Sequence, residues 1–249
     1  MKTKYWFEDF TEKSYQELLK LGKSSYEFIT YSDYERFNRK ILWRHDVDFS
    51  LHRALALAKI ERKEEVNSTY FLHLHSIHYN LLEEELTEII NEIIALDHEI
   101  GLHYDPYYYE QVCHAKADQL QFIKIEKEYL EQLFDTPINA ISIHQPETNS
   151  TLDLTVEKIG DMVNAYSNFI MENYSYCSDS NGYWRFRRLY DVLNEGEDNA
   201  LQILTHPVWW TPEVMSPRNR VSRCIDGRRD KQTLIYDQLM ETLGRDNIQ

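Results

Sequence analysis

One short stretch constrains the fold of this 249-residue chain more than any other: Trp-Arg-His-Asp-Val-Asp at positions 43–48. Two further apolar residues, Ile41 and Leu42, precede it, and a helical pattern of apolar residues over 51–60 follows it. An apolar run followed by such a pattern predicts a buried strand that leads into a helix. Ligands of α/β proteins bind at this end of the strands, so the carboxylates of the stretch are candidates for chemistry.

The two carboxylates belong to Asp46 and Asp48. Residues two apart on an extended chain point to the same side, so their charges repel unless a metal, a proton or a cation lies between them. A purely structural interpretation is equally open, in which Asp48 caps the following helix and Asp46 pairs with Arg44.

The composition favours one globular domain over 1–249, with an N-terminal helical segment over about 1–38. The chain is 42% hydrophobic and 28% charged, which is enough apolar surface for a sizeable core. Its net charge of -15 repels phosphate backbones, so we expect no nucleic-acid partner. The three cysteines, Cys113, Cys177 and Cys224, are too scattered for a disulfide framework or a cysteine-rich zinc site.

Membrane and export signals are weak. No apolar run is long enough to cross a membrane, and the acidic residues Glu8, Asp9 and Glu12 interrupt any signal-peptide core. We therefore expect a cytoplasmic location and no membrane span. The glycosylation-like tripeptides that begin at 67, 149 and 173 are then chance matches.

Strand-like and helix-like segments alternate along the chain. After the strand that carries the aspartates, further strands are expected over 68–72, 98–103, 138–143 and 201–205, with a weaker candidate around Phe169. Helices are expected over 10–36, 51–60, 81–96, about 114–134 and about 230–243. The region 147–194 has the least regular pattern. Alternation of this kind predicts a parallel sheet, either open or closed.

Imidazoles follow three of the other strands: His103, His144 and His206. A lone histidine at a strand end is more often structural than a ligand, but four strand ends in register are harder to explain in that way. Carboxylate and imidazole together suit a divalent metal, zinc above all, with an open position for water. A further acid can take a proton from that water and a further histidine can protonate a leaving group, so the pattern predicts metal-assisted hydrolysis.

Three of these motifs resemble those of NodB-type polysaccharide deacetylases, carbohydrate esterase family four. They are Asp46-Val47-Asp48, His-Glu-Ile-Gly-Leu-His at 98–103, and Leu-Thr-His-Pro at 204–207, and together they cover roughly residues 40 to 210. The resemblance implies a distorted (β/α) barrel of parallel strands that removes an N-acyl group from an amino sugar. It also implies that His103 binds the metal and that His206 is the general acid, beside an acetyl pocket lined by Leu204.

The chain departs from the family pattern at three places. The family has adjacent aspartates, whereas Val47 separates them here, so we assign Asp46 as base and Asp48 as metal ligand, with the reverse also open. The second metal histidine of the family falls on Tyr107, a poor zinc ligand, and His144 is our candidate for the missing imidazole.

The third departure concerns the arginine that braces the base in the family, for which Arg185 is our candidate. The variant pattern is similar to that of outlying deacetylase-like proteins associated with bacterial surface-polysaccharide synthesis.

The leading functional hypothesis is a metal-dependent hydrolase that removes an N-acyl group, acetyl in the first instance, from an amino sugar or glycan precursor. Trp209, Trp210 and Tyr107 are candidates for binding the sugar, because aromatic faces stack on sugar rings. Two alternatives stay open: a metal-independent hydrolase of a non-sugar C–N bond, and a non-catalytic carbohydrate-binding protein on the same fold. The substrate, the acyl group and the oligomeric state are left open.

Overall fold

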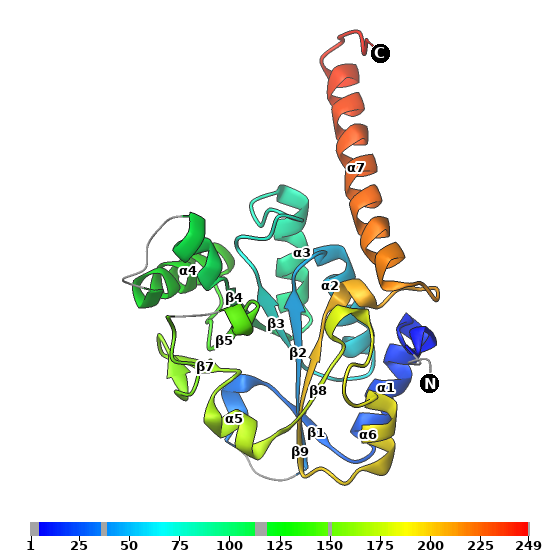
Figure 1. Ribbon diagram of the computed structural model, residues 1–249. Coiled ribbons are helices and arrows are strands. Elements are labelled where there is room, and N and C mark those ends of the chain that lie inside the picture. Colours follow the sequence, from blue (N-terminus) through cyan, green and yellow to red (C-terminus); the bar gives the residue numbers. More distant parts are fainter. Residues whose placement is uncertain (1–4, 36–38, 113–118, 149–150, 249) are drawn as a thin grey trace.

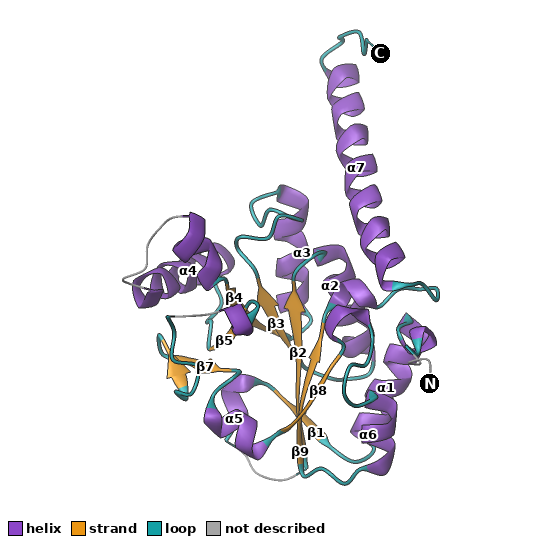
Figure 2. Ribbon diagram, in the orientation of Figure 1, coloured by secondary structure: helices purple, strands orange, loops and turns teal. Residues whose placement is uncertain are grey.

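A mostly parallel β-sheet, curled into a half-barrel and flanked by helices, organises the chain (Figures 1 and 2). The structure is a computed structural model that describes residues 5–35, 39–112, 119–148 and 151–248. The strands are β1 Glu27–Ile29, β2 Lys40–Val47, β3 Thr69–Leu72, β4 Glu99–Tyr104, β5 Ala140–Ile143, β6 Lys158–Ile159, β7 Met162–Asn164, β8 Ser175–Ser178 and β9 Ala200–Thr205.

The α-helices are α1 Glu12–Lys23, α2 Leu51–Lys63, α3 Glu84–Ala95, α4 Gln119–Phe134, α5 Asn168–Asn173, α6 Leu189–Glu195 and α7 Pro217–Thr242. Short 3-10 segments are η1 Phe7–Asp9, η2 Tyr31–Asp33, η4 Pro146–Thr148, η5 Ser180–Gly182 and η6 Pro207–Trp209, and η3 Tyr108–Val112 is a π-helical turn. None of the helices within the described ranges has a stretch of sufficient length and hydropathy to span a bilayer.

The strand order is β6-β7-β5-β4-β3-β2-β9-β8, and the short strand β1 pairs with the first part of β2. These pairs are parallel except for the hairpin of β6 and β7. This confirms the expected α/β architecture of parallel strands. Because β6 and β8 form the two edges, the barrel is open rather than closed.

The two faces of β2 serve different cores. Trp43 packs against the flanking helices, whereas Leu42 packs inside the half-barrel with Phe71 of β3. Because side chains alternate along a strand, Arg44 and Asp46 share the inner face with Leu42. The register of the central strand therefore directs the charged side chains toward the concave side of the sheet.

Gly101 of β4 allows this interior to close. It pairs in register with Phe71, and a Cβ atom at position 101 would lie 2.6 Å from the Phe71 ring. The glycine of the His-Glu-Ile-Gly-Leu-His motif thus makes room for an aromatic ring directly below His103.

The N-terminal segment is only partly helical, so our expectation of a helix over 10–36 is wrong beyond Lys23. Glu27–Ile29 forms β1 instead, because pairing with β2 satisfies its backbone and buries Ile29. Ser24 and Ser25, which are weak helix formers, separate the helix from the strand.

Two further expectations need correction. Phe169 lies in helix α5 rather than in a strand, since Ser167 caps that helix by accepting a hydrogen bond from the Ile170 backbone N–H. The closing helix α7 begins well before 230, at Pro217, where Ser216 supplies the cap. The expected start of the helix near 114, Cys113 and most of the tripeptide at 149–151 lie outside the described residues.

Candidate active site

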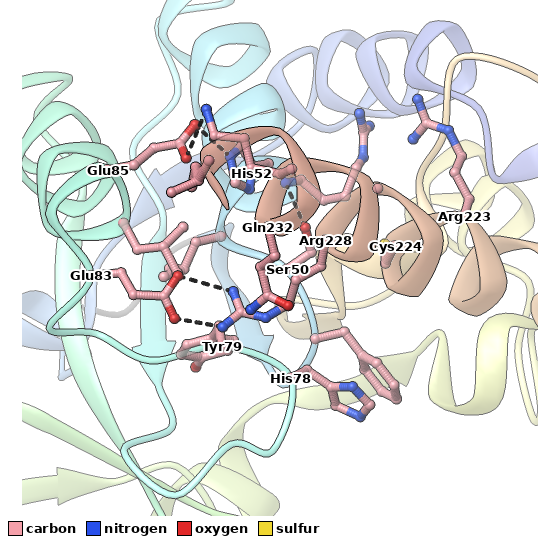
Figure 3. Close-up of a pocket in the computed structure, with 17 residues that line it drawn as sticks. Ser50, His52, His78, Tyr79, Glu83, Glu85, Arg223, Cys224, Arg228 and Gln232 are labelled. Carbon is pink, nitrogen blue, oxygen red and sulfur yellow. Dashed lines mark hydrogen bonds and ion pairs between the residues drawn. The ribbon is translucent and has the colours of Figure 1, made fainter. Parts of the chain in front are cut away.

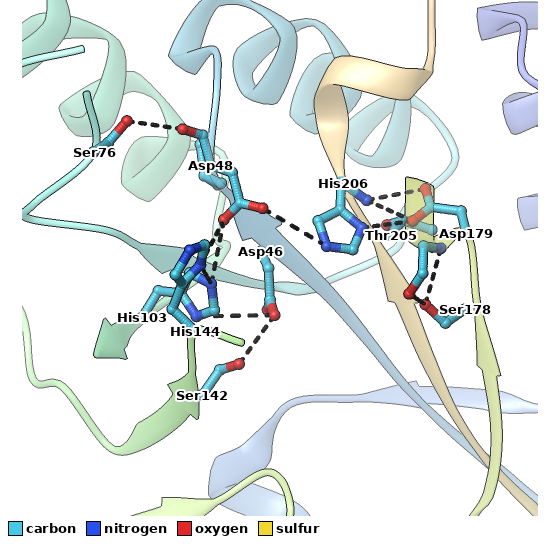
Figure 4. Close-up of polar contacts among 12 residues, drawn as sticks. Asp46, Asp48, Ser76, His103, Ser142, His144, Ser178, Asp179, Thr205 and His206 are labelled. Carbon is cyan, nitrogen blue, oxygen red and sulfur yellow. Dashed lines mark hydrogen bonds and ion pairs between the residues drawn. The ribbon is translucent and has the colours of Figure 1, made fainter. Parts of the chain in front are cut away.

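The predicted metal-binding side chains meet at the end of β2 that leads into α2 (Figure 4). One oxygen of Asp48, Oδ1, lies 3.2 Å from Nε2 of His103 and 3.7 Å from Nδ1 of His144. The two ring nitrogens lie 3.2 Å from each other. Asp48 follows β2, His103 ends β4 and His144 follows β5, so neighbouring parallel strands deliver all three to one point.

This triad fits a divalent metal. Its ligand atoms all lie within 4.8 Å of one another, and Asp48 Oδ1 is buried without a hydrogen-bond partner among the described residues. In a tetrahedral zinc site with bonds of about 2.1 Å, ligand atoms lie roughly 3.4 Å apart, close to the separations found here. Burial by itself would raise the pKa of Asp48, but the neighbouring imidazoles of His103 and His144 hold it well below its usual range. Asp48 is therefore an ionised carboxylate.

Asp46 lies beside the triad and is held in place through one oxygen. Ser142 donates a 3.0 Å hydrogen bond to Oδ2, and Nη2 of Arg44 lies 3.6 Å from the same atom. The other oxygen, Oδ1, is buried and has no hydrogen-bond partner among the residues that the structure describes. Asp46 thus presents one free acceptor, as a general base requires.

The structural interpretation of the two aspartates is half right. Asp46 does pair with Arg44, but the cap of α2 is Ser50, whose hydroxyl accepts from the backbone N–H of Arg53. Asp48 is left to face the histidines.

The arginine beside Asp46 is Arg44, and the structure does not bring Arg185 to Asp46. Arg185 is exposed, with its guanidinium over the ring of Phe186. Arg44 is fully buried and donates a 2.9 Å hydrogen bond to the Tyr166 hydroxyl. Burial by itself would lower the pKa of Arg44, but the Asp46 carboxylate holds it well above its usual range, so Arg44 stays charged. The arginine that contacts Asp46 is therefore Arg44, two residues before it on the same strand, and not the expected Arg185.

His206 approaches Asp48 from the other side (Figure 4). Its Nε2 lies 3.8 Å from Oδ2 of Asp48, whereas its Nδ1 lies 2.6 Å from Oδ1 of Asp179. Burial by itself would lower the pKa of His206, but the Asp179 carboxylate raises it to about 9. His206 is thus a protonated imidazolium at neutral pH in the metal-free chain.

Sequence reasoning missed Asp179. This buried carboxylate directly follows β8 and also accepts hydrogen bonds from the backbone N–H of His206 and from Nε1 of Trp210. The sequence pattern that could have identified it is an acid at the end of a strand. The sequence of β8 is Ser-Tyr-Cys-Ser, however, and lacks the apolar run by which a strand is recognised.

The two tryptophans expected to bind the sugar, Trp209 and Trp210, are both buried. Trp210 is fully buried between Phe10 and Tyr15, where its indole N–H holds Asp179. Trp209 also packs in the core and is 9% exposed. Trp209 is the last residue of the short turn η6 and Trp210 follows it, and both indoles pack into the layer between the sheet and the helices.

Two other predicted residues lie at different depths. Tyr107 is 56% exposed and is not part of the triad. Leu204 is buried on β9, where it is paired in register with Arg44 and precedes His206 by two residues. It therefore shares the inner face of the sheet with the site.

His73, which had no role in the sequence-based reasoning, adds a further imidazole to this cluster. It follows β3, its ring centroid lies 4.5 Å from that of His144, and its Nε2 lies 3.6 Å from Oδ2 of Asp105. Burial lowers the pKa of His73 to about 4, so the ring is neutral. His73 packs against a ligand candidate without adding positive charge.

Comparison with known proteins adds a few weak likenesses. No family profile and no curated protein matches this chain. Among solved structures, it is similar to BA3943 of Bacillus anthracis, described as a CE4 family pseudoenzyme, at 11% identity and a TM-score of 0.41, over 75% of this chain and 60% of that one. The chain thus spans well under two thirds of the length of BA3943.

Two further structures are similar to the same degree. The Streptococcus pyogenes deacetylase PplD in complex with acetate has 16% identity and a TM-score of 0.40, with 84% of each chain covered. A family 4 acetyl xylan esterase from Clostridium thermocellum, in complex with a cobalt ion, has 13% identity and a TM-score of 0.40, over 76% of this chain and 84% of that one. Likeness at this level gives no argument about activity, which rests on the side chains described above.

Proposed function

We propose that this chain is a metal-dependent hydrolase that removes an N-acyl group, acetyl in the first instance, from an amino sugar or glycan precursor. The observation that carries the proposal is the arrangement around Asp48. One of its oxygens faces His103 and His144 at metal-ligand spacing, the other faces His206, and a second carboxylate lies beside them.

Asp48, His103 and His144 would hold the cation, with zinc as the first candidate because the donors are one carboxylate and two imidazoles. A divalent ion held there supplies Lewis acidity, which polarises an acyl carbonyl and makes water more acidic. The three side chains leave the remaining directions to water and substrate, as catalytic zinc sites do.

Asp46 is the base in this proposal. Arg44 and Ser142 fix its Oδ2, so Oδ1 is left to accept a proton from the attacking water.

His206 is the acid. Its Nδ1–H donates to Asp179, and because the ring is an imidazolium, Nε2 carries a second proton, which faces Asp48 and the reacting centre. An amide nitrogen leaves only after it is protonated, and an imidazolium on the wall opposite the base supplies that proton. Leu204, on the same face of β9, is our candidate for contact with the methyl of the acyl group.

The amino-sugar substrate comes from the motif resemblance, which also links such variants to surface-polysaccharide synthesis. A cytoplasmic location would favour a nucleotide-linked or lipid-linked sugar over finished cell wall. The chemistry of the site limits the substrate only to an amide whose carbonyl reaches the triad.

The first test measures metal content by mass spectrometry on protein prepared without chelator. We expect close to one equivalent in the wild type, loss on His103→Ala or His144→Ala, and retention in the control Tyr107→Phe. A wild type without bound metal would favour the metal-independent alternative.

The second test measures release of acetate from N-acetylated amino sugars. Asp46→Asn and His206→Ala should each lower turnover by about a hundredfold or more and keep the metal. Sugar binding without turnover in the metal-loaded wild type would favour the carbohydrate-binding alternative. Full activity of His206→Ala at every pH would remove the acid from the mechanism.

A further inference from the structure

Helix α7 packs against the rest of the protein over much less of its surface than the other elements do. It runs for 26 residues, and Arg220 is its only buried side chain among those described. Its first half is tied to the body, for example by the ion pair of Arg228 with Glu83, and its second half extends away from the body (Figure 1). Helices without tertiary packing are marginally stable in water, so the second half is expected to have a partner.

A stripe of mostly apolar residues runs along one side of α7. Positions 221, 225, 228, 232, 235 and 239 follow one another at intervals of three and four, the spacing of a coiled-coil seam. These positions are Val221, Ile225, Arg228, Gln232, Ile235 and Leu239, and Leu243 continues the line. Ile235, Leu239 and Leu243 are each about half exposed, so the distal part of the stripe is uncovered.

A groove lies beside the first half of the same stripe (Figure 3). Two adjoining cavities of about 450 and 230 Å³ share Phe49, His78 and Arg228 in their walls. Ile77, which is 92% exposed, lines the smaller cavity opposite Ile225. One half of α7 therefore borders a groove lined by both apolar and charged residues, and the other half carries an uncovered apolar ridge.

A groove and a ridge on the same helix suit an isologous contact between two copies of the chain. A two-fold axis places the ridge on the second half of each α7 against the groove beside the first half of the other α7. Charge favours the same pairing. Segment 217–231 has six basic and two acidic residues, a net of +4, whereas 232–246 has one basic and three acidic, a net of -2. Antiparallel pairing places each basic half beside an acidic half, whereas parallel pairing places the basic halves together.

We propose that two copies of this chain associate through α7 in antiparallel orientation. The distal half of each helix lies in the groove of the other, with the two-fold axis near Gln232. Ile225 then packs near Leu239 of the partner subunit, and Val221 near Leu243 of the partner subunit. Phe49, which lines the groove, directly follows Asp48 in the chain, so the contact adjoins the segment that carries the carboxylate of the triad.

Sedimentation equilibrium of the full chain tests the association. We expect twice the monomer mass of 30.0 kDa for the wild type and for Leu234→Glu, the matched control, which is equally exposed but lies on the opposite side of the helix. Leu239→Glu should weaken the dimer roughly tenfold or more, because a buried leucine contact is lost. Circular dichroism checks that the variants stay folded. A monomeric wild type at all concentrations, or equal loss in the control, would overturn the proposal.

Cysteine cross-linking tests the orientation. Gln232→Cys lies next to its own copy across the axis and should form an intersubunit disulfide on mild oxidation. Leu239→Cys lies about 20 Å from its own copy in the antiparallel pair, at 1.5 Å per residue, and should not cross-link to itself. Efficient cross-linking of both variants would indicate a parallel pair and refute the arrangement.

Discussion

Replacing Asp179 by Asn tests the polar core of the site without requiring a known substrate. In the metal-free chain the Asp179 carboxylate raises the pKa of His206 from 6.5 to about 9, which corresponds to roughly 3 kcal/mol at 1.36 kcal/mol per unit. Asn has nearly the same shape but no charge. Burial lowers the pKa of His206, and in the variant mainly Asp48 would still raise it, from an oxygen 3.8 Å away. We therefore expect the pKa of His206 to fall to 6.5 or below.

The assay is NMR titration of the imidazole resonances in chelator-treated protein, with Asp105→Asn as the control, since Asp105 faces His73 rather than His206. The shift also predicts stability: the contribution of His206 is fully present below pH 6.5 and is lost as the pH rises through 9, and Asp179→Asn removes this dependence. At pH 7.5 the metal-free variant would keep at most about a tenth of its His206 protonated, whereas the wild type keeps nearly all of it. A midpoint near 6.5 in the wild type, or the same midpoint in both proteins, would refute the reasoning.

Three further changes test other parts of the structure. Glu61 is buried, and although burial opposes its charge, His45 lowers its pKa from 4.5 to about 2, so its contribution to stability is present above pH 4.5 and is lost as the pH falls toward 2. Glu61→Gln should therefore cost up to about 3 kcal/mol at pH 7 and little at pH 2, as measured by urea unfolding. Gly101→Ala should cost about 1–3 kcal/mol in the same assay, and Phe71→Leu in the same chain should restore part of that loss. Arg44→Lys should lower turnover yet leave metal content unchanged, and loss of metal would contradict its placement beside the base alone.

The elements that could be predicted from sequence are those with dense apolar patterns. Strands β2, β4 and β9 each contain a cluster of apolar residues, Ile-Leu-Trp, Ile-Gly-Leu and Ile-Leu, so the strands could be located and the histidines at the ends of β4 and β9 assigned to one edge. Strand β8 is four polar or small residues, and a strand of that kind becomes visible only once β9 is known to pair with it. Asp179 was missed for that reason.

Side-chain direction was the second limit. Trp210 follows the candidate acid closely, which suggested a substrate contact, yet the turn after β9 rotates the indole into the core. The arginine was misassigned for the opposite reason. Arg44 was given only a structural pairing, although a residue two positions before Asp46 on the same strand shares its face of the sheet. Alternation along one strand was a stronger argument than the motif resemblance that pointed to Arg185.

The geometry also favours one assignment of the two aspartates over the other. His103 faces both, with Nε2 3.2 Å from Asp48 and Nδ1 3.8 Å from Asp46. If Asp46 were the metal ligand, His144 would have to turn toward it, but Ser142 and Arg44 already occupy the Asp46 oxygen that faces this side. Asp48 meets both imidazoles with a single oxygen and keeps the other for His206. Since a ligating imidazole usually directs its second nitrogen toward a carboxylate, Asp46 would also orient His103. Asp46→Asn should then lower metal affinity by about ten- to a hundredfold, yet keep the metal when metal is in excess, while turnover falls by about a hundredfold or more.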